Sequence, residues 1–310
     1  MEVATHQKSK HLRSVKDWWT LFKATYSAWS NSQPFRQSAV IAYYAIFSLP
    51  ALLVIIIAIA SLVFGQDAVS QKIYGDIAST MGQSTAKDVQ LMIESANSHK
   101  DSILAIIIGA CTLVIGSIGV FEELHTSLNI VWNVRTKQNL SIWKKLRMKV
   151  FSFGLVMTIG FLLLVSLVLT ALIAALSKWV QAHFPDQIVF LLHFADILLS
   201  MGIITLLFAM MFKILPDAKV KWRYVWKGAI LTSFLFLLGK YALGIYFGKA
   251  NPASAYGAAG SIVLILLWVN YSSLILFFGA EFTKQFALFH GGGIEPSENG
   301  EMLPDNCWQQ

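Results

Sequence analysis

Six long blocks of apolar residues constrain the fold of this chain more than any other feature. They cover residues 39–64, 103–121, 150–176, 188–212, 228–247 and 258–280. About 20 apolar residues in a helix, at about 1.5 Å rise each, cross a hydrocarbon core of about 30 Å. Lipid offers no hydrogen-bond partners to the peptide backbone, so each block is expected to be helical. The sequence therefore predicts an all-α integral membrane protein with a bundle of six transmembrane helices.

The scarcity of charge leads to the same conclusion. Only 13% of the 310 residues are charged, whereas 56% are hydrophobic. A soluble domain carries charge on about a quarter of its residues. This chain has too few charged side chains to cover a water-facing surface.

Most lysines and arginines fall on one side of the predicted bundle. They cluster before the first block, between the second and third blocks, and between the fourth and fifth. The opposite side carries only Lys72, Lys87, Lys100, Lys178 and Lys249. By the positive-inside rule, both termini are predicted to be cytoplasmic. This topology explains the net charge of +7, so nucleic acid is not an expected partner.

Three segments outside the apolar blocks each predict a different kind of structure. Residues 1–35 are predicted to be a cytoplasmic N-terminal segment, followed by a transmembrane domain over 36–290. In the first segment, "HLRSVKDWWTLFKATYSAW" predicts an amphipathic interfacial helix in the headgroup layer, or alternatively a helix packed on the bundle. Residues 66–101 predict a helical external connection, and the acidic residues of 291–310 predict a disordered cytoplasmic tail.

Four stretches carry a resemblance to a known family. They are "AYYAIFSLPALLVIIIAIASLVFG", "GSIGVFEELHTSLNIVWNV", "KILPDAKVKWRYVWKGAI" and "YGAAGSIVLILLWVNYSSLILFFGAEF". With these motifs in this order, the chain resembles the YihY/virulence factor BrkB family of bacterial inner-membrane proteins, once labelled ribonuclease BN. The resemblance implies six helices, cytoplasmic ends and a multi-pass location in the bacterial inner (plasma) membrane. For the family, transport has been proposed.

The histidines do not support the ribonuclease label. They form no ligand cluster along the chain and are His6, His11, His99, His125, His183, His193 and His290. No Cys/His zinc spacing and no Gly-rich phosphate loop occurs either. We predict a protein that is not an enzyme, with no catalytic residue, metal or cofactor.

Polar residues inside the blocks form an outer layer. Asp196 and Lys240 lie at matching depths below the predicted external surface, and His193 shares the helical face of Asp196. Ionisable residues within spans usually face the protein interior or a water-filled cavity. The candidate polar cavity comprises Asp196, Lys240, His193, Asn270, Tyr43 and Tyr44. The alternatives are a structural Lys240–Asp196 pair, or a Lys240 side chain that extends outward to water. Asn270 could equally hydrogen-bond a neighbouring helix.

A second polar layer lies at the predicted cytoplasmic ends of the helices. It comprises Glu122, Glu123, His125, Asn129, Glu281 and Arg147. The first interpretation is an ion-pair cluster that locks helix ends together, and the second is an internal gate.

These features predict a transporter or permease that moves a small molecule, lipid or amphiphile through a polar cavity between helices. The alternative is a structural or envelope-assembly protein whose buried charges serve folding only. The expected partners are membrane lipids and a substrate that the sequence does not identify, and a homo-oligomer is compatible with both hypotheses.

Overall fold

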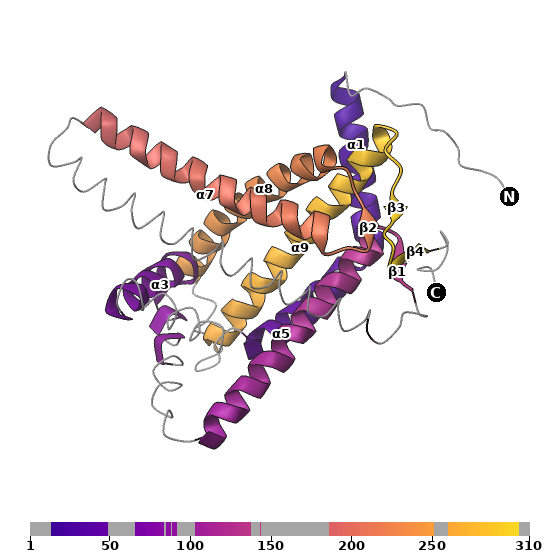
Figure 1. Ribbon diagram of the computed structural model, residues 1–310. Coiled ribbons are helices and arrows are strands. Elements are labelled where there is room, and N and C mark those ends of the chain that lie inside the picture. Colours follow the sequence, from indigo (N-terminus) through magenta and orange to yellow (C-terminus); the bar gives the residue numbers. More distant parts are fainter. Residues whose placement is uncertain are drawn as a thin grey trace.

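Helices dominate the computed structural model, which describes residues 14–48, 66–83, 85–87, 89–91, 103–137, 143, 186–250 and 260–303 (Figure 1). The described helices include α1 (Val15–Asn31), α3 (Gln66–Met81), α5 (Ile103–Val131), α7 (Asp186–Ile214), α8 (Trp222–Ala250) and α9 (Gly260–Phe289). Residues 34–48 are also helical. The predicted block at 150–176 and most of the block at 39–64 lie outside the described residues.

Three described helices are long and apolar enough to cross a membrane. The qualifying segments are Ile197–Ile214, Trp222–Phe247 and Ile262–Phe289, which correspond to the fourth, fifth and sixth predicted blocks. The second predicted block lies within α5. The structure thus describes a helical membrane protein, and the full count of six spans stays a prediction.

Helices α8 and α9 approach closely through two glycines that face threonines. A Cβ atom added to Gly228 would lie 1.6 Å from Oγ1 of Thr283, and one added to Gly279 would lie 1.7 Å from Oγ1 of Thr232. Both threonine hydroxyls donate to glycine carbonyls of their own helix, at 2.7 Å. Small residues at such contacts allow two backbones to pack tightly in a membrane.

Helices α7 and α8 are joined at one point by hydroxyl groups. Oγ1 of Thr205 lies 2.7 Å from Oγ of Ser233, and both residues are buried. The rings of Phe208 and Phe236 contact each other one turn further along, with centroids 5.8 Å apart. On the N-terminal side of Thr205, α7 diverges from α8 (Figure 1).

Helix α1 lies against α9. Ser14 and Asp17 form a capping box that fixes its first turn. Leu21 is fully buried, and the ring of Phe22 lies 5.6 Å from that of Phe282 on α9. On the same helix, Trp19 stays 74% exposed. The helix therefore packs one face on the bundle and leaves the adjacent aromatic face uncovered.

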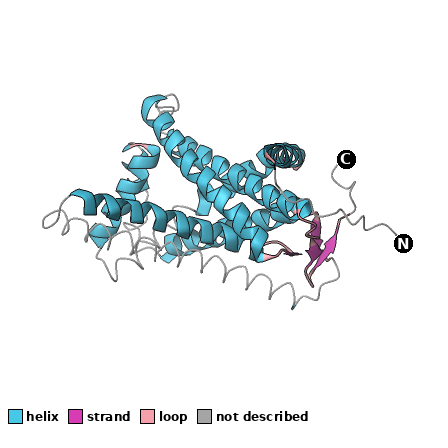
Figure 2. Cartoon of the chain, turned by 90° about the horizontal axis from the view of Figure 1, so that it is seen from above, coloured by secondary structure: helices cyan, strands magenta, loops and turns pink. Residues whose placement is uncertain are grey.

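Two small antiparallel sheets form at one end of the molecule (Figure 2). Strand β1 (Val134–Thr136) pairs with β4 (Gly300–Met302), and β2 (Ala218–Lys219) pairs with β3 (Glu295–Pro296). The main hydrophobic core lies at this end, around the fully buried rings of Trp132, Phe212 and Phe277.

The strands correct the expectation of disorder after residue 290. Residues 291–303 are placed, and their backbone bonds to earlier segments: the N–H of Leu303 donates to the carbonyl of Asn133, at 2.9 Å. Glu301 lies opposite Arg135, with Nε to Oε1 at 2.6 Å. The acidic composition that suggested a solvated tail instead serves cross-strand pairing with a basic strand. Residues 304–310 lie outside the described residues.

Candidate functional site

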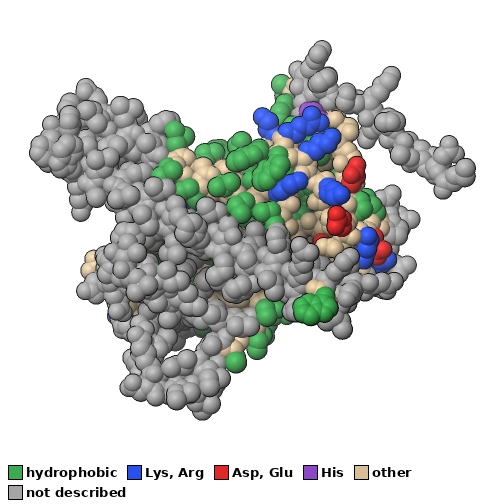
Figure 3. All heavy atoms as spheres, viewed as in Figure 1, with side chains coloured by type: hydrophobic (Ala, Val, Ile, Leu, Met, Phe, Trp, Pro, Cys, Tyr) green, Lys and Arg blue, Asp and Glu red, His purple; other side chains and the backbone are tan. Residues whose placement is uncertain are grey.

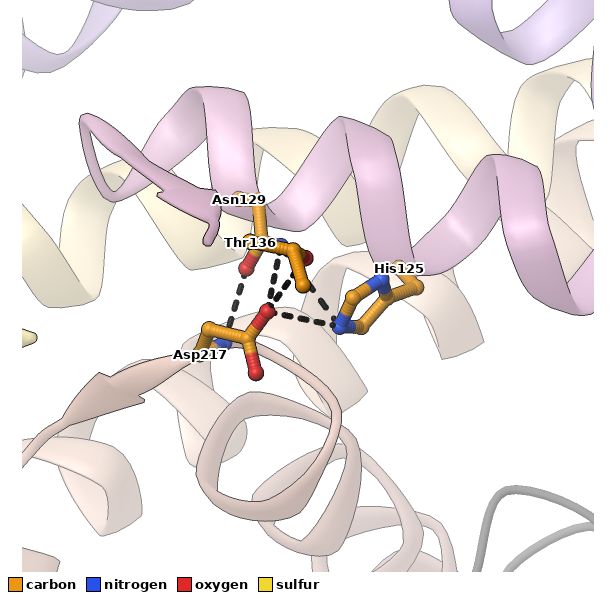
Figure 4. Close-up of polar contacts among 4 residues, drawn as sticks. All are labelled: His125, Asn129, Thr136 and Asp217. Atoms are coloured by element: carbon orange, nitrogen blue, oxygen red, sulfur yellow. Dashed lines mark hydrogen bonds and ion pairs between the residues drawn. The ribbon is translucent and has the colours of Figure 1, made fainter. Parts of the chain in front are cut away.

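Asp217 is the residue on which the polar contacts of the strand-bearing end converge (Figure 4). Its Oδ2 accepts hydrogen bonds from Nδ2 of Asn129, at 3.2 Å, and from Oγ1 of Thr136, at 2.7 Å. Nε2 of His125 lies 3.3 Å from the same oxygen. We call His125, Asn129, Thr136 and Asp217 the Asp217 junction. It joins α5, β1 and the segment between α7 and α8.

Local sequence explains why Asp217 reaches this place. Helix α7 ends at Ile214, and Pro216 follows, which lacks the N–H needed to continue a helix. The free N–H of Asp217 donates to Oδ1 of Asn129, at 2.7 Å. The amide of Asn129 thus contacts both the backbone and the carboxylate of Asp217, which fixes the orientation of the turn.

The His125 ring belongs to the junction through both geometry and charge. It stacks on Phe121, with an interplanar angle of 13°, and its side chain remains 19% exposed. Burial alone would raise the pKa of the Asp217 carboxyl. The hydrogen bonds from His125, Thr136 and Asn129, with the charge of His125, lower that pKa below its ordinary value of 3.8. The carboxylate is therefore held in its ionised form.

The C-terminal strands close over the junction. The N–H of Ser297 donates to the carbonyl of Asp217, at 2.8 Å. A Cβ atom added to Gly300 would lie 2.4 Å from the same carbonyl oxygen. Gly300 is thus required where the tail crosses Asp217, since any side chain would collide with the backbone there.

A second buried cluster surrounds Glu281 on α9. Its side chain is almost fully buried and lies 3.5 Å from Nζ of Lys284, one turn along the helix. Nε2 of Gln285 donates to the Glu281 carboxylate, at 3.1 Å, and Lys284 also donates to Oδ1 of Asn133, at 3.3 Å. The cluster thereby ties α9 to the end of α5.

Some residues of the predicted inner layer lie in these two clusters, and others lie outside them. His125 and Asn129 lie in the Asp217 junction, and Glu281 lies in its own cluster. Glu123 accepts a hydrogen bond from Ser127, at 3.3 Å, within α5, whereas Glu122 is exposed. Arg147 lies outside the described residues.

The predicted outer layer is only partly described. Nδ2 of Asn270 donates to Oγ of Ser38, at 3.2 Å, so it bonds a neighbouring helix. Tyr44 packs on Gly119 of α5, and Tyr43 is 59% exposed. Lys240 is partly buried, and none of the described side chains pairs with its ammonium group.

The proposed Lys240–Asp196 pair stays a prediction. Both residues belong to helices that the structure describes, but the side chains of His193 and Asp196 are outside its description. The candidate polar cavity therefore stays a prediction.

Asp217 itself is the residue that sequence reasoning missed. The sequence contained a signal for this residue. Asp217 follows Pro216 just after the fourth apolar block, where the chain is expected to leave the membrane. The described residues contain no group of three or more His, Cys, Asp or Glu side chains able to hold a metal ion. The oxygen Oδ2 of Asp217 already has three partners, so the junction is suited to joining segments of the chain.

Fold and site together define a helical membrane protein in which the C-terminal strands and two connections between helices meet in a polar junction. Residues 25–295 match the family described as virulence factor BrkB, and the chain belongs to this family. The family identified from the sequence motifs is thereby confirmed.

Similar proteins carry equally general descriptions. A UPF0761 membrane protein of Pseudoalteromonas translucida is 23% identical, over 89% of this chain and 88% of the relative. One of Albidiferax ferrireducens is 29% identical over 56% of this chain, and one of Stenotrophomonas maltophilia (strain K279a) is 24% identical over 84%. The matches span only 39% and 59% of these two longer relatives. No solved structure matches.

Proposed function

We propose that this protein is an inner-membrane transporter or permease for a small molecule, lipid or amphiphile, and not an enzyme. In this proposal six helices span the membrane, both termini are cytoplasmic, and the substrate passes between the helices. The distribution of lysine and arginine along the chain supports the orientation.

Lys240 is the observation that carries the proposal. It lies about seven residues, or roughly 10 Å, inside the end of the Trp222–Phe247 span. A cation within a span costs about 2.5–3.5 kcal/mol unless water or an anion solvates it. Lys240 is partly buried, and no described side chain pairs with it; the side chain of Asp196, its predicted partner, lies outside the described residues. A hydrated path or a bound anionic group beside α8 would supply that solvation.

A second candidate is a structural or envelope-assembly protein. The specific observation in its favour is that two pairs of polar side chains hydrogen-bond each other between helices. Asn270 bonds Ser38, and Thr205 bonds Ser233. Such pairs contribute about 0.6 kcal/mol each to helix association and need no substrate.

Flux across reconstituted vesicles tests the first proposal. The purified protein is placed in liposomes with fluorescent phosphatidylglycerol, fluorescent phosphatidylcholine and a fluorescent single-chain amphiphile as probes. Wild type is expected to move at least one probe faster than empty vesicles do. Lys240→Met keeps the apolar stem but removes the charge, and should slow that flux about tenfold, equivalent to about 1.4 kcal/mol in the barrier.

Lys87→Met provides the matched control, since Lys87 is exposed on a helical segment outside the three candidate spans. The control variant should keep the wild-type rate. Equal flux in wild type, Lys240→Met and empty vesicles would remove the support for transport. Protein-dependent flux that is unaffected by Lys240→Met would retain transport and exclude Lys240 from the path.

A further inference from the structure

Exposed aromatic and basic side chains lie next to one another where α8 begins. Trp222 and Trp226 are 47% and 40% exposed, and they lie one turn apart. Lys221, Arg223 and Lys227 are exposed beside them. We call these five residues the basic tryptophan patch.

The patch lies at the end of a stripe that faces the hydrocarbon. Continuing from Trp226 at intervals of three or four residues, each apolar side chain is at least 46% exposed: Ile230, Phe234, Leu238, Tyr241 and Ile245. Side chains at this spacing share one face of a helix. Because the candidate span begins at Trp222, the two tryptophans occupy the level of the membrane–water interface, where such amphipathic rings are enriched.

Neighbouring residues hold the patch in place. Nζ of Lys213 lies 5.9 Å from the centre of the Trp222 ring. The guanidinium of Arg223 lies 4.5 Å from the ring centre of Tyr224 and donates to its hydroxyl. Tyr224 is buried and contacts Phe286 of α9, so Arg223 is anchored to the bundle. Its remaining N–H donors are available at the surface, in the fork that suits phosphate.

The positive charges of the patch are not neutralised by described acidic side chains. Among the described residues, no carboxylate forms an ion pair with Lys221, Arg223 or Lys227. The acidic side chains of this end have other neighbours: Glu301 pairs with Arg135, and Glu295 lies opposite Lys219. Asp217 contacts His125, and Glu281 contacts Lys284. Figure 3 shows Lys and Arg side chains gathered above the apolar band, with the acidic ones further toward the strands.

We propose that the basic tryptophan patch binds the phosphate-bearing headgroups of anionic phospholipids. The tryptophan rings lie among the headgroups and the upper acyl chains, while Arg223, Lys227 and Lys221 contact phosphate oxygens. This surface anchors the start of α8 to negatively charged lipids. Because Tyr224 is part of the hydrophobic core, the core is anchored to the same lipids. The inference does not rest on transport, because the patch would bind lipid equally in a structural protein.

Lipid retention by the purified protein tests this inference. Native mass spectrometry compares binding of phosphatidylglycerol and phosphatidylcholine, added in equal amounts to the detergent-solubilised protein. Wild type should retain phosphatidylglycerol preferentially. R223Q/K227Q should weaken its binding about tenfold, since each cation near an anionic surface contributes severalfold.

R135Q/K137Q is the matched control, because it removes the same charge from the same end of the molecule. Arg135 is paired with Glu301, and Lys137 donates to the carbonyl of Glu298. This variant should retain phosphatidylglycerol within about twofold of wild type, a difference of about 0.4 kcal/mol. Equal retention of the two lipids by wild type, or equal losses in the two variants, would overturn the inference.

A second measurement keeps the inference testable if R223Q/K227Q does not fold. Phosphatidylglycerol should raise the apparent melting temperature of wild type more than phosphatidylcholine does, because a ligand of the folded state stabilises it. That difference should shrink as ionic strength rises from about 0.05 M to about 0.5 M, where charges are screened within a few ångströms. A difference that does not change with salt would contradict phosphate recognition by these side chains.

Discussion

Asp217 joins three parts of the chain that are far apart in sequence. Its carboxylate contacts His125 and Asn129 of α5 and Thr136 of β1, and its carbonyl accepts the N–H of Ser297 in the tail. Removing one partner from such a buried network leaves the others without hydrogen bonds, which costs about 1–3 kcal/mol per group.

Asp217→Asn tests the charge of this residue while keeping its size. Because folding lowers the pKa of Asp217, its ionised form stabilises the protein fully above its ordinary value of 3.8. That stabilisation is lost as the pH falls through the lowered pKa of the folded state. We expect the variant to unfold more easily than wild type near neutral pH, by about 1–3 kcal/mol, and the gap to narrow in acid.

Chemical unfolding of both proteins in detergent, followed by tryptophan fluorescence from about pH 7 to about pH 3, measures this gap. Glu298→Gln is the control, because that carboxylate is exposed and should alter stability little at any pH. A gap between Asp217→Asn and wild type that stays constant down to the lowest pH would mean that the Asp217 charge does not stabilise the fold.

The sequence predicted part of this site and could not predict the rest. His125 and Asn129 are four residues apart on one helix, so their shared face followed from spacing alone. Asp217 is 88 positions away from Asn129, and no local pattern specifies which turn will meet which helix end. The tail was misjudged for a related reason, since the pairing of Glu301 with Arg135 is visible only after folding.

At the scale of whole elements, helices α8 and α9 interlock by reciprocal packing of glycine and threonine. A threonine side chain of each helix fills the space that a side chain on the facing glycine would need. Hydropathy predicted both helices, yet it cannot identify these contacts, because hydrocarbon is as apolar as the residues that face it.

Gly279→Ala should separate α8 from α9. The added methyl group would lie 1.7 Å from Oγ1 of Thr232, so the helices must move apart or the threonine must rotate. We expect a loss of about 1–3 kcal/mol, typical of an overpacked contact. The apparent melting temperature of the variant in detergent reports this loss.

The double variant T232A/G279A distinguishes steric conflict from a general effect of alanine. Shortening Thr232 removes the colliding hydroxyl, so the second substitution should restore most of the lost stability. If the two losses simply add, the direct contact between these positions does not determine helix packing.

At the scale of the molecule, the strands bring three segments to one end of the helices. Residues 134–136, 218–219 and 295–302 pair with one another there and must share one side of the membrane. The basic residues cluster in the same connections, and which side of the membrane these occupy stays a prediction. The membrane-protein class and the family followed from the sequence, whereas the closure of this end by the tail required the structure.

Cysteine accessibility in intact cells tests this arrangement most directly. In a background with Cys111 and Cys307 replaced by serine, single cysteines replace Lys137, Lys219, Glu298 or Lys87. We predict that a membrane-impermeant maleimide labels the Lys87→Cys protein in cells whose outer membrane alone is permeabilised. The other three should be labelled only after the inner membrane is opened. Labelling of Lys137→Cys, Lys219→Cys and Glu298→Cys on different sides of that membrane would contradict the account.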